Sequence, residues 1–285
     1  MSQKNSIADT LREATQALQT AGVAEARREA GSLLSFVIGK DRTFLLSHAQ
    51  DLLAITDLDR FREAVARRAE GEPTQYITGV QDFFGREFRV TPDVLIPRPE
   101  TELLVEAALK TIADLSAPFV CDVGTGSGCI AVTLLCERSH AQAVAVDVSQ
   151  AALAIAAENA RRHGVEKRIE LKISDCFDAV NQTAFDLVVS NPPYVSSEAL
   201  PGLQREVRDH EPLIALSPGA DGLSVIRRLL QDAPRFLKPG GHLIMEIGFD
   251  QGEKIRELIV PEMWHLVDIR PDLQSIPRIV VVRRV

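Results

Sequence analysis

The sequence predicts an α/β protein in which a mostly parallel sheet carries helices on both faces, preceded by a small helical bundle and a β-hairpin connector. Three patterns indicate this order. Over about residues 6–70, apolar residues recur at the spacing of amphipathic helices. A glycine then separates two short runs that have the character of paired strands. After Pro118, strand-like and helix-like segments alternate, which is typical of a parallel sheet.

The composition is that of a globular protein with a substantial core. The 285 residues, 45% hydrophobic and 25% charged, suffice for one large or two modest domains. The net charge of −8 argues against broad neutralisation of phosphates, so no direct nucleic-acid partner is expected. The first five residues lack the apolar core of a signal peptide and no run approaches membrane-spanning length, so we expect a cytoplasmic chain without a membrane partner. The four cysteines lack zinc-site spacing, and no metal is expected.

Four amphipathic helices are expected in the N-terminal region. The first should end at Gly22, and the second, from about Ala24, at Gly39, because glycine readily adopts the left-handed conformation that closes a helix. Asp41 and Asp57 each stand where a side chain can cap the third and the fourth helix. The region carries no catalytic constellation, so its expected role is recognition of a partner or support.

The connector is expected to form a β-hairpin. Its strands fall near residues 82–84 and 87–90, and Gly85 supplies the turn between them. The predicted division of the chain follows from this hairpin. Residues 1–75 are expected to form a helical domain that recognises the substrate, residues 76–97 the connector and residues 98–285 the sheet domain.

A helix is expected directly after the connector. Pro99 is suited to the first helical position, and Glu100 and Glu102 fall in the first turn, where the helix dipole favours acidic side chains. For Arg98 and Glu100, simple capping and surface solvation is the preferred interpretation, and their role is otherwise left open.

Seven short apolar runs in the last part of the chain are the expected strands, at residues 119–123, 143–146, 169–173, 185–190, 243–247, 264–269 and 279–282. Amphipathic segments between them are expected to form helices, at residues 129–137, 149–162, 223–236 and 251–260. Because no helix separates the last two runs, one of these strands should be antiparallel to its neighbours.

The turn after the first of these strands is rich in glycine. Asp122 precedes the candidate ligand-binding residues Gly124, Thr125, Gly126, Ser127 and Gly128. Glycines let a ligand lie against backbone N–H groups at the start of the following helix. A dinucleotide fingerprint would have its third glycine one residue later, so the spacing fits a nucleoside without a pyrophosphate better than NAD. An ordinary strand-to-helix turn is the alternative.

Two aspartates follow the next two strands. Asp147 can accept both hydroxyls of a ribose, although it also stands where an acid precedes the helix that Ser149 caps. Asp175 can accept from the exocyclic amine of an adenine, with Cys176 or Phe177 covering the ring. Loops after strands often carry aspartate, which is the alternative for Asp175.

The fourth strand ends in Asn191, Pro192, Pro193 and Tyr194, which we call the NPPY corner. Ligands of open α/β sheets bind at the carboxyl ends of the strands, where this corner is expected to lie. The two prolines stiffen the backbone and remove two N–H groups, so the corner mainly accepts hydrogen bonds. Such a corner suits a flat group that carries an NH2, and a proline-stiffened loop with an Asn turn is the alternative.

Together these positions resemble the class I S-adenosylmethionine-dependent methyltransferases over about residues 100–285. The resemblance implies a seven-stranded methyltransferase sheet and S-adenosyl-L-methionine as cofactor. The NPPY corner narrows it to enzymes that methylate planar amino groups, either adenine N6 in nucleic acid or a glutamine amide in protein. The remaining segments are similar to the HemK/PrmC family, at residues 95–102, 211–212, 221–223 and 246–248.

Membership of the HemK/PrmC family would imply methylation of the glutamine in the Gly-Gly-Gln motif of class I peptide chain release factors. The implied catalytic residues are Asn191, Pro192 and Tyr194, and the implied substrate site is the whole NPPY corner, with Asn191 also near the cofactor. The Asn191 oxygen and the Pro192 carbonyl would each accept one N–H of the glutamine, Tyr194 would pack on the amide plane, and no strong base is needed. Where family members often carry a bulkier aromatic residue this chain has Cys176, for which Phe177 is expected to compensate.

Three alternatives remain open at this stage. A sister family that methylates a glutamine of a ribosomal protein shares Asn-Pro-Pro-Tyr but departs from the segment at residues 95–102. An adenine-N6 nucleic-acid methyltransferase would need to hold a flipped base and its backbone, against which the acidic balance counts. A protein that binds S-adenosylmethionine only as a structural or sensing ligand would leave the NPPY corner unexplained.

Overall fold

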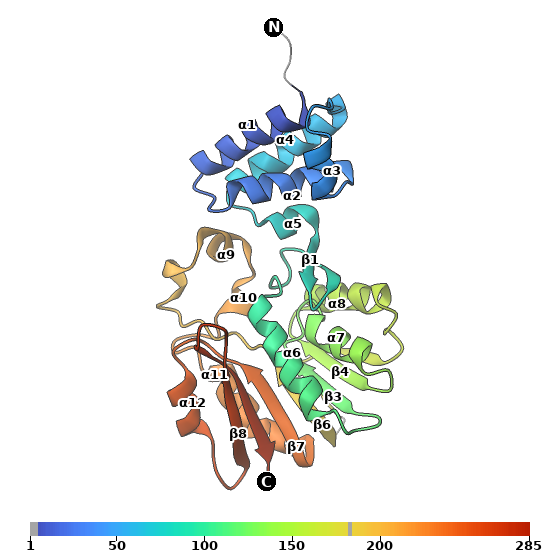
Figure 1. Ribbon diagram of the computed structural model, residues 1–285. Coiled ribbons are helices and arrows are strands. Elements are labelled where there is room, and N and C mark those ends of the chain that lie inside the picture. Colours follow the sequence, from blue (N-terminus) through green and yellow to red (C-terminus); the bar gives the residue numbers. More distant parts are fainter. Residues whose placement is uncertain (1–4, 182–183) are drawn as a thin grey trace. The chain divides into compact units, whose positions relative to one another are not determined.

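The computed structural model describes residues 5–181 and 184–285, and its contacts divide the chain into two compact units (Figure 1). The first unit is Met1–Gly79 together with Gln204–His210, and the second is Val80–Leu203 together with Glu211–Val285. Residues 1–4, which belong to the segment in which no signal peptide is expected, lie outside the described residues. In the part of the chain that is described, no helix has both the length and the apolar character needed to cross a membrane.

The first unit is helical, as predicted. Its helices are α1 (Ile7–Thr20), α2 (Ala26–Ile38), α3 (Arg42–Ser47), α4 (Ile55–Ala69), α5 (Thr74–Thr78) and α9 (Arg205–His210). Leu18, Leu33, Leu34 and Phe61 are almost fully buried and form the centre of its core. Residues three or four apart share one face of a helix, and the apolar recurrence over residues 6–70 reflects such buried faces.

The predicted helix ends are mostly confirmed. Gly39 closes α2 in the left-handed conformation, and Asp41 caps α3 by accepting from the Phe44 N–H at 2.7 Å. The prediction that Asp57 caps the fourth helix is wrong. Helix α4 begins at Ile55, two residues before Asp57, because the Leu58 N–H already bonds to the Ala54 carbonyl, and this places Asp57 inside the first turn.

The short helix α9 belongs to the first unit although its neighbours along the chain belong to the second. Arg68 is buried and bonds to both Glu29 and Glu206, the latter at 2.5 Å. Arg205 donates to the Glu70 carbonyl at 2.7 Å. Neither α5 nor α9 is predicted from the sequence, since both are too short to show a helical period.

The second unit contains a seven-stranded sheet in the order β5-β4-β3-β6-β7-β9-β8, which confirms the predicted fold class. The strands are β3 (Phe119–Val123), β4 (Gln142–Asp147), β5 (Ile169–Ile173), β6 (Phe185–Ser190), β7 (Leu237–Glu246), β8 (Trp264–Pro271) and β9 (Pro277–Arg284). Strand β9 is antiparallel to both of its neighbours, as expected for one of the last two strands, and the other adjacent pairs are parallel.

Helices cover both faces of this sheet. The helices of the second unit are α6 (Pro99–Thr111), α7 (Cys129–Glu137), α8 (Gln150–Arg162), α10 (Leu213–Leu216), α11 (Ser224–Asp232) and α12 (Gly252–Leu258), with short 3-10 turns at Leu200–Gly202 and Ala233–Arg235. One apolar cluster joins Leu104 of α6 and Leu134 of α7 to the sheet. A second cluster joins Leu229 of α11 and Ile255 of α12 to it. Buried on both faces, the central strands are nearly continuous apolar runs.

The hairpin is confirmed, with strands β1 (Val80–Phe83) and β2 (Arg86–Arg89) in antiparallel pairing. Its two turn residues, Phe84 and Gly85, both have positive φ, which is the geometry that matches the twist of a tight hairpin. Phe83 and Phe88 are buried in the cluster that also contains α6. Glu102 of α6 accepts from the Phe84 N–H at 2.7 Å, so the hairpin and this helix are fastened together.

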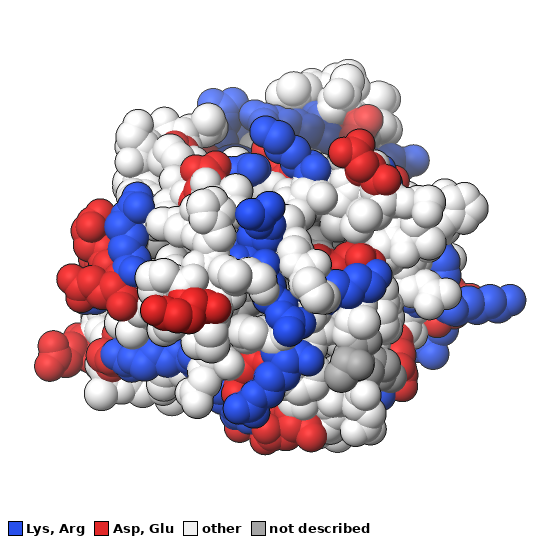
Figure 2. Space-filling view, turned by 90° about the horizontal axis from the view of Figure 1, so that it is seen from below, with Lys and Arg blue, Asp and Glu red and all other residues white. Residues whose placement is uncertain are grey.

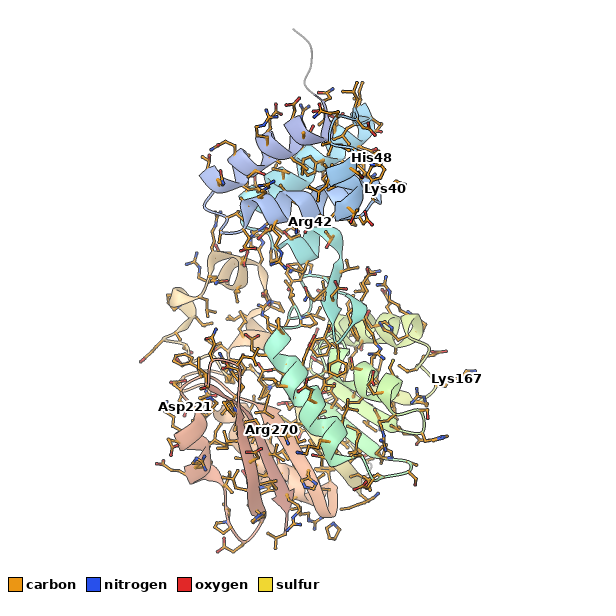
Figure 3. All side chains as sticks on the ribbon, viewed as in Figure 1. Lys40, Arg42, His48, Lys167, Asp221 and Arg270 are labelled. Carbon is orange, nitrogen blue, oxygen red and sulfur yellow. The ribbon has the colours of Figure 1, made fainter. Side chains whose placement is uncertain are left out.

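Many charged side chains of the second unit form pairs of opposite sign. On the face seen in Figure 2, Lys and Arg side chains lie among Asp and Glu side chains. Lys238 contacts Asp186 at 2.6 Å, and Arg270 of β8, labelled in Figure 3, contacts Asp268 at 3.0 Å. Exposed pairs of this kind contribute about 0–1 kcal/mol each, so the apolar clusters carry most of the stability.

Candidate active site

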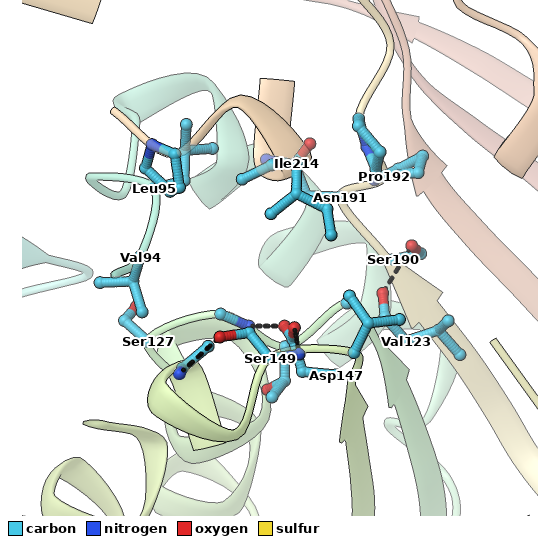
Figure 4. Close-up of a pocket in the computed structure, with 18 of the residues that line it drawn as sticks. Val94, Leu95, Val123, Ser127, Asp147, Ser149, Ser190, Asn191, Pro192 and Ile214 are labelled. Carbon is cyan, nitrogen blue, oxygen red and sulfur yellow. Dashed lines mark hydrogen bonds between the residues drawn. The ribbon is translucent and has the colours of Figure 1, made fainter. Parts of the chain in front are cut away.

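A cavity of about 320 Å³ opens at the carboxyl ends of the parallel strands (Figure 4). This is the edge at which open α/β sheets bind their ligands, and the volume lies in the range of roughly 300–1,000 Å³ that small-molecule sites occupy. Its wall is built from several separate segments of the second unit, at residues 93–97, 123–127, 147–149, 174–176, 190–193 and 212–218.

Most of the predicted site residues line this cavity: Gly124, Thr125, Gly126, Ser127, Asp147, Asp175, Cys176, Asn191, Pro192 and Pro193. Of the residues that the structure describes, the lining does not include three predicted ones, Gly128, Phe177 and Tyr194. The fold therefore places the two motifs singled out in the sequence, the glycine turn and the NPPY corner, on one cavity.

The glycine turn is fixed mainly by hydrogen bonds from its backbone N–H groups to the end of β4. The N–H groups of Gly124 and Thr125 both donate to the Val146 carbonyl at 2.9 Å, which fastens the turn to the end of β4. Gly128 has a φ of 80°, and a Cβ there would lie 3.1 Å from the Cβ of Ala156. Gly128 therefore serves the close packing of the turn on α8 and not the cavity wall.

A buried carboxylate stands behind this turn. Asp122 is fully buried and accepts from the Thr125 hydroxyl at 2.7 Å. Burial raises the pKa of Asp122 to about 7, and the hydrogen bond from Thr125 partly opposes this rise. The pair links the carboxyl end of β3 to the first residues of the glycine turn.

Asp147 connects the glycine turn to the end of β4. One carboxylate oxygen accepts from the Gly126 N–H at 2.9 Å, and the other accepts from the Ser149 N–H at 2.9 Å (Figure 4). Each carboxylate oxygen can accept more than one hydrogen bond, so both remain able to meet ligand hydroxyls in the cavity. The alternative role is met in part, because Asp147 does bond to the residue that caps α8, and Ser149 accepts from Ala152.

The segment after β5 has a more exposed acid. The Asp175 side chain is 64% exposed and pairs with Arg228 at 2.8 Å. Cys176 is buried, lines the cavity and has a φ of 47°. Phe177 instead stacks on Phe236, with ring centroids 4.6 Å apart, inside the core on one face of the sheet.

The NPPY corner is held by a chain of side-chain hydrogen bonds. The Asn191 Nδ2 donates to the Thr101 hydroxyl oxygen at 3.1 Å, and the Thr101 hydroxyl donates to Glu246 Oε2 at 2.7 Å. The Tyr194 hydroxyl donates to the other oxygen of Glu246 at 3.0 Å. We call these four residues the Asn191 network. It joins the start of α6 and the ends of β6 and β7.

The protonation of the network follows from its burial. Burial raises the pKa of Tyr194 far above its ordinary value, and the nearby Glu246 raises it further, so the phenol keeps its proton. Burial also raises the pKa of Glu246, while the hydroxyls of Thr101 and Tyr194 and the charge of Arg278 lower it.

The backbone of the NPPY corner is pinned by Gln251. Its side-chain NH2 donates to the carbonyls of Tyr194 and Gly222, at 3.0 and 3.2 Å, and its oxygen accepts from the Gly248 N–H at 2.9 Å. Gly222 has a φ of 72°, and a Cβ there would lie 2.3 Å from the Tyr194 carbonyl oxygen. Only glycine fits in this approach. Asp221, labelled in Figure 3, accepts from the Leu223 N–H at 3.1 Å and so supports the turn.

Arg98 corrects one expectation. It occupies the position before α6, but its side chain makes no capping bond in the described structure and instead pairs with the buried carboxylate of Glu211. The same carboxylate accepts from the Ile96 N–H at 3.4 Å. The pair therefore joins residues 95–98 to the segment that begins at Pro212, and both segments line the cavity.

Several wall residues were not predicted as site residues. Thr101, Leu95 and Pro212 are examples. The signal that pointed to them is the set of segments quoted for the family resemblance, at residues 95–102, 211–212, 221–223 and 246–248. Each of these segments lines the cavity or supports the NPPY corner. In the described residues, no group of three or more His, Cys, Asp or Glu could hold a metal ion.

Two family models match the chain. The model described as the PrmC N-terminal domain matches residues 9–79, and the one described as the methyltransferase small domain matches residues 99–205. A release factor glutamine methyltransferase from Cereibacter sphaeroides is 47% identical over 278 residues, which cover 97% of this chain and 98% of that protein. The chain belongs to the release factor glutamine methyltransferase family.

Other comparisons agree with this family. A release factor glutamine methyltransferase from Nitratidesulfovibrio vulgaris is 44% identical over 96% of this chain and 94% of that protein. Among solved structures, the hMettl16 catalytic domain in complex with the MAT2A 3′UTR hairpin 1 superposes with a TM-score of 0.57 at 15% identity, over 88% of this chain and 90% of that chain. That likeness shows the methyltransferase fold alone. The resemblance to the HemK/PrmC family is thus confirmed.

Proposed function

We propose that this protein transfers a methyl group from S-adenosyl-L-methionine to the side-chain amide nitrogen of the glutamine in the Gly-Gly-Gln motif of class I peptide chain release factors. The relatives that are 44–47% identical over nearly the whole chain carry the corresponding name. The observation that carries the proposal is the position of Asn191. Its side-chain NH2 donates to Thr101, and Asn191 lines the cavity beside two prolines. A cytoplasmic location, where translation termination takes place, belongs to the same proposal.

The cavity residues fit the cofactor. The left-handed glycines at 124 and 126 leave the turn without side chains there, and nothing described lies within 4 Å of where a Cβ would be. Asp147 offers a carboxylate for ribose hydroxyls, and Val148 and Cys176 offer apolar surface for a base at the same wall. When bound, S-adenosylmethionine would supply a methyl group activated by a positively charged sulfur. Asp175 is proposed to meet the base edge, although its pairing with Arg228 reduces its availability.

The NPPY corner is proposed to position the substrate amide. An amide nitrogen is a poor nucleophile because its lone pair is delocalised into the carbonyl. The Asn191 oxygen and the Pro192 carbonyl would each accept one N–H, which orients the nitrogen and stabilises the positive charge that develops on it. The nitrogen would form the new bond to the methyl carbon with its own electron pair while the bond from that carbon to sulfur breaks and leaves its electron pair on sulfur. One N–H proton would leave to solvent afterwards, so no strong base is needed.

Tyr194 is proposed to act from behind the corner. Its hydroxyl is occupied by Glu246 and its carbonyl by Gln251, so both ends of the residue hold the corner in place. The expected contact between its ring and the substrate amide remains a proposal. Residues 1–75 are likewise proposed to take part in recognition of the protein substrate.

The function is tested by methyl transfer from labelled S-adenosylmethionine to purified release factor. The matched control is the same release factor with the glutamine of its Gly-Gly-Gln motif replaced by alanine. Ribosomal proteins, DNA and RNA serve as parallel acceptors. We expect label on the intact release factor and none on the control. Label on ribosomal protein or on adenine, with the release factor unlabelled, would overturn the proposal in favour of the corresponding alternative.

A further inference from the structure

We infer that Glu246 and Thr101 are positioning residues that set which end of the Asn191 amide faces the substrate, and thereby make the site select a carboxamide over a carboxylate. The inference rests on the proposed function, because it concerns how the same site holds the glutamine. Glu246 and Thr101 lie on different elements, at the end of β7 and in the first turn of α6, and both are almost fully buried. Neither is required by the proposed contacts to the substrate.

The number of protons available along the Asn191 network fixes the direction of its hydrogen bonds. Both oxygens of Glu246 act as acceptors, because Oε2 accepts from the Thr101 hydroxyl at 2.7 Å and Oε1 accepts from the Tyr194 hydroxyl at 3.0 Å. A hydroxyl has one proton. Because the Thr101 hydroxyl donates its one proton to Glu246, its oxygen can only accept a hydrogen bond from Asn191. Of the two ends of the Asn191 amide, only the NH2 can donate that bond.

The orientation is set by the protein and not by solvent. Thr101 is 2% exposed and Glu246 is 1% exposed, so bulk water does not compete for their hydrogen bonds. With the NH2 of Asn191 turned to Thr101, its oxygen is the end left to meet a group in the cavity, which Pro192 also lines and where the Pro192 carbonyl is the proposed second acceptor. Two neighbouring acceptors pair well with the NH2 of a glutamine and repel the oxygens of a glutamate.

Replacing Glu246 by glutamine should reverse this chain of bonds. A glutamine at 246 offers one oxygen and one NH2. If its oxygen stays on Tyr194, its NH2 donates to Thr101, Thr101 donates to the Asn191 oxygen, and every group is satisfied. If its NH2 points to Tyr194 instead, the buried phenol proton has no acceptor, which is costly. The first arrangement turns the Asn191 amide over and presents its NH2 to the substrate.

The experiment measures selectivity and turnover in Glu246→Gln. Binding is measured for two forms of the release factor, with Gly-Gly-Gln and with Gly-Gly-Glu, in the presence of S-adenosylhomocysteine. We expect the preference for the glutamine form to fall at least about tenfold relative to the unmodified enzyme. The kcat for the glutamine form should fall about 100-fold or more, with the Kd for S-adenosylmethionine within about threefold.

A matched control is Asp122→Asn, which removes the other buried carboxylate that accepts from a threonine hydroxyl. It lies behind the glycine turn, so any effect should fall on the cofactor side and leave the selectivity between the two release factor forms unchanged. A loss of kcat in Glu246→Gln with unchanged selectivity would show a merely structural role and overturn the inference. Unchanged kcat and selectivity would overturn it as well.

A second pair of variants keeps the test decisive if Glu246→Gln does not fold. Thr101→Val has nearly the same shape but neither donates nor accepts, so the Asn191 amide loses its fixed orientation. Thr101→Ser retains the hydroxyl. We expect selectivity to fall in Thr101→Val and to be restored in Thr101→Ser, with at least ten times the kcat of the valine variant. Equal behaviour of the two variants would overturn the inference. Failure of the unmodified enzyme to label the release factor at all would instead overturn the proposed function.

Discussion

The two motifs that face each other across the cavity are held in place by different means. The glycine turn and the NPPY corner follow β3 and β6, which are adjacent parallel strands. The turn is fixed by the end of the adjacent strand β4, through the backbone carbonyl of Val146 and the side-chain carboxylate of Asp147. The corner is fixed by side chains from distant segments, chiefly Glu246 and Gln251.

Both motifs nevertheless depend on a threonine hydroxyl that donates to a buried carboxylate at 2.7 Å. In the turn the partners are Asp122 and Thr125, three residues apart. In the corner they are Thr101 and Glu246, 145 residues apart. The local pair forms with the turn itself, whereas the long-range pair forms only when α6, β6 and β7 have come together. The comparison predicts that substitutions in the corner affect turnover and that substitutions in the turn affect cofactor affinity and stability.

The largest expected effect is that of Asn191→Ala. Removing the amide eliminates one of the two acceptors for the substrate N–H groups, so we expect kcat to fall about 10³-fold or more. The Kd for S-adenosylmethionine, measured by calorimetry, should change less than about threefold, because the cofactor side keeps its own contacts. Near-normal turnover in this variant would show that the corner does not position the substrate.

A pH-dependent effect is expected from Asp122. Its pKa is raised from 3.8 to about 7 in the folded protein, so the folded state binds the proton more tightly than the unfolded state. The stabilisation is fully present below about pH 4 and is lost as the pH rises towards 7, at about 1.4 kcal/mol per pH unit. Above pH 7 no further loss is expected from this residue.

Asp122→Asn is therefore expected to flatten the pH dependence. Denaturant unfolding of both proteins between pH 5 and 8 gives the difference in slope directly. Glu246 has a raised pKa as well, but it is present in both proteins and cancels in the comparison. Parallel curves for the two proteins would show that Asp122 does not titrate as the structure indicates.

The same contrast explains what could be predicted from the sequence. The sheet, both helical layers, the hairpin and the glycine turn rest on local periodicity and on glycine spacing, so they were predictable. The capping role of Asp57 was wrong because a helix start also depends on which carbonyl the first N–H groups meet, here that of Ala54. A residue that can cap does not by itself fix the first turn.

Side-chain direction after an irregular backbone was less predictable. Cys176 and Phe177 are adjacent in sequence, but the left-handed conformation of Cys176 turns the chain, and Phe177 packs on Phe236 in the core. The Asn191 network was also beyond local patterns, because Thr101 and Glu246 meet only through the fold. The assignment of α9 to the helical unit likewise depends on Arg68, whose partners are far apart in sequence.

An intermediate effect is expected from Gly222→Ala. A Cβ at this position would lie 2.3 Å from the Tyr194 carbonyl oxygen and 2.9 Å from Gln251 Nε2, so the corner must shift. Misplacement of about 1 Å can cost about 100-fold in rate, and we expect a loss of kcat of that order. Gly240→Ala is the matched control, since its φ is similar at 76° and nothing described lies within 4 Å of the added Cβ.

The two glycine variants separate strain from displacement. Both must adopt a left-handed conformation that costs about 1–2 kcal/mol, so both should lose a similar amount of stability from that source. Only the variant at 222 is expected to lose turnover, measured under saturating concentrations of both substrates. Equal kcat values for the two variants would mean that the Tyr194 backbone does not need to be held where it is.

The smallest expected effect distinguishes the two aspartates of the cofactor side. Asp147 is tied to the glycine turn by the Gly126 N–H, whereas Asp175 is 64% exposed and paired with Arg228. A hydrogen bond to a charged group contributes about 1.5–3 kcal/mol, so Asp147→Ala should weaken S-adenosylmethionine binding about 10- to 100-fold. Asp175→Ala should weaken it less than about fivefold, because solvent and Arg228 already compete for that carboxylate. Calorimetry measures the Kd for S-adenosylmethionine in both variants. A larger loss of affinity in Asp175→Ala would show that the principal acidic contact of the cofactor lies in the segment after β5 and not at the end of β4.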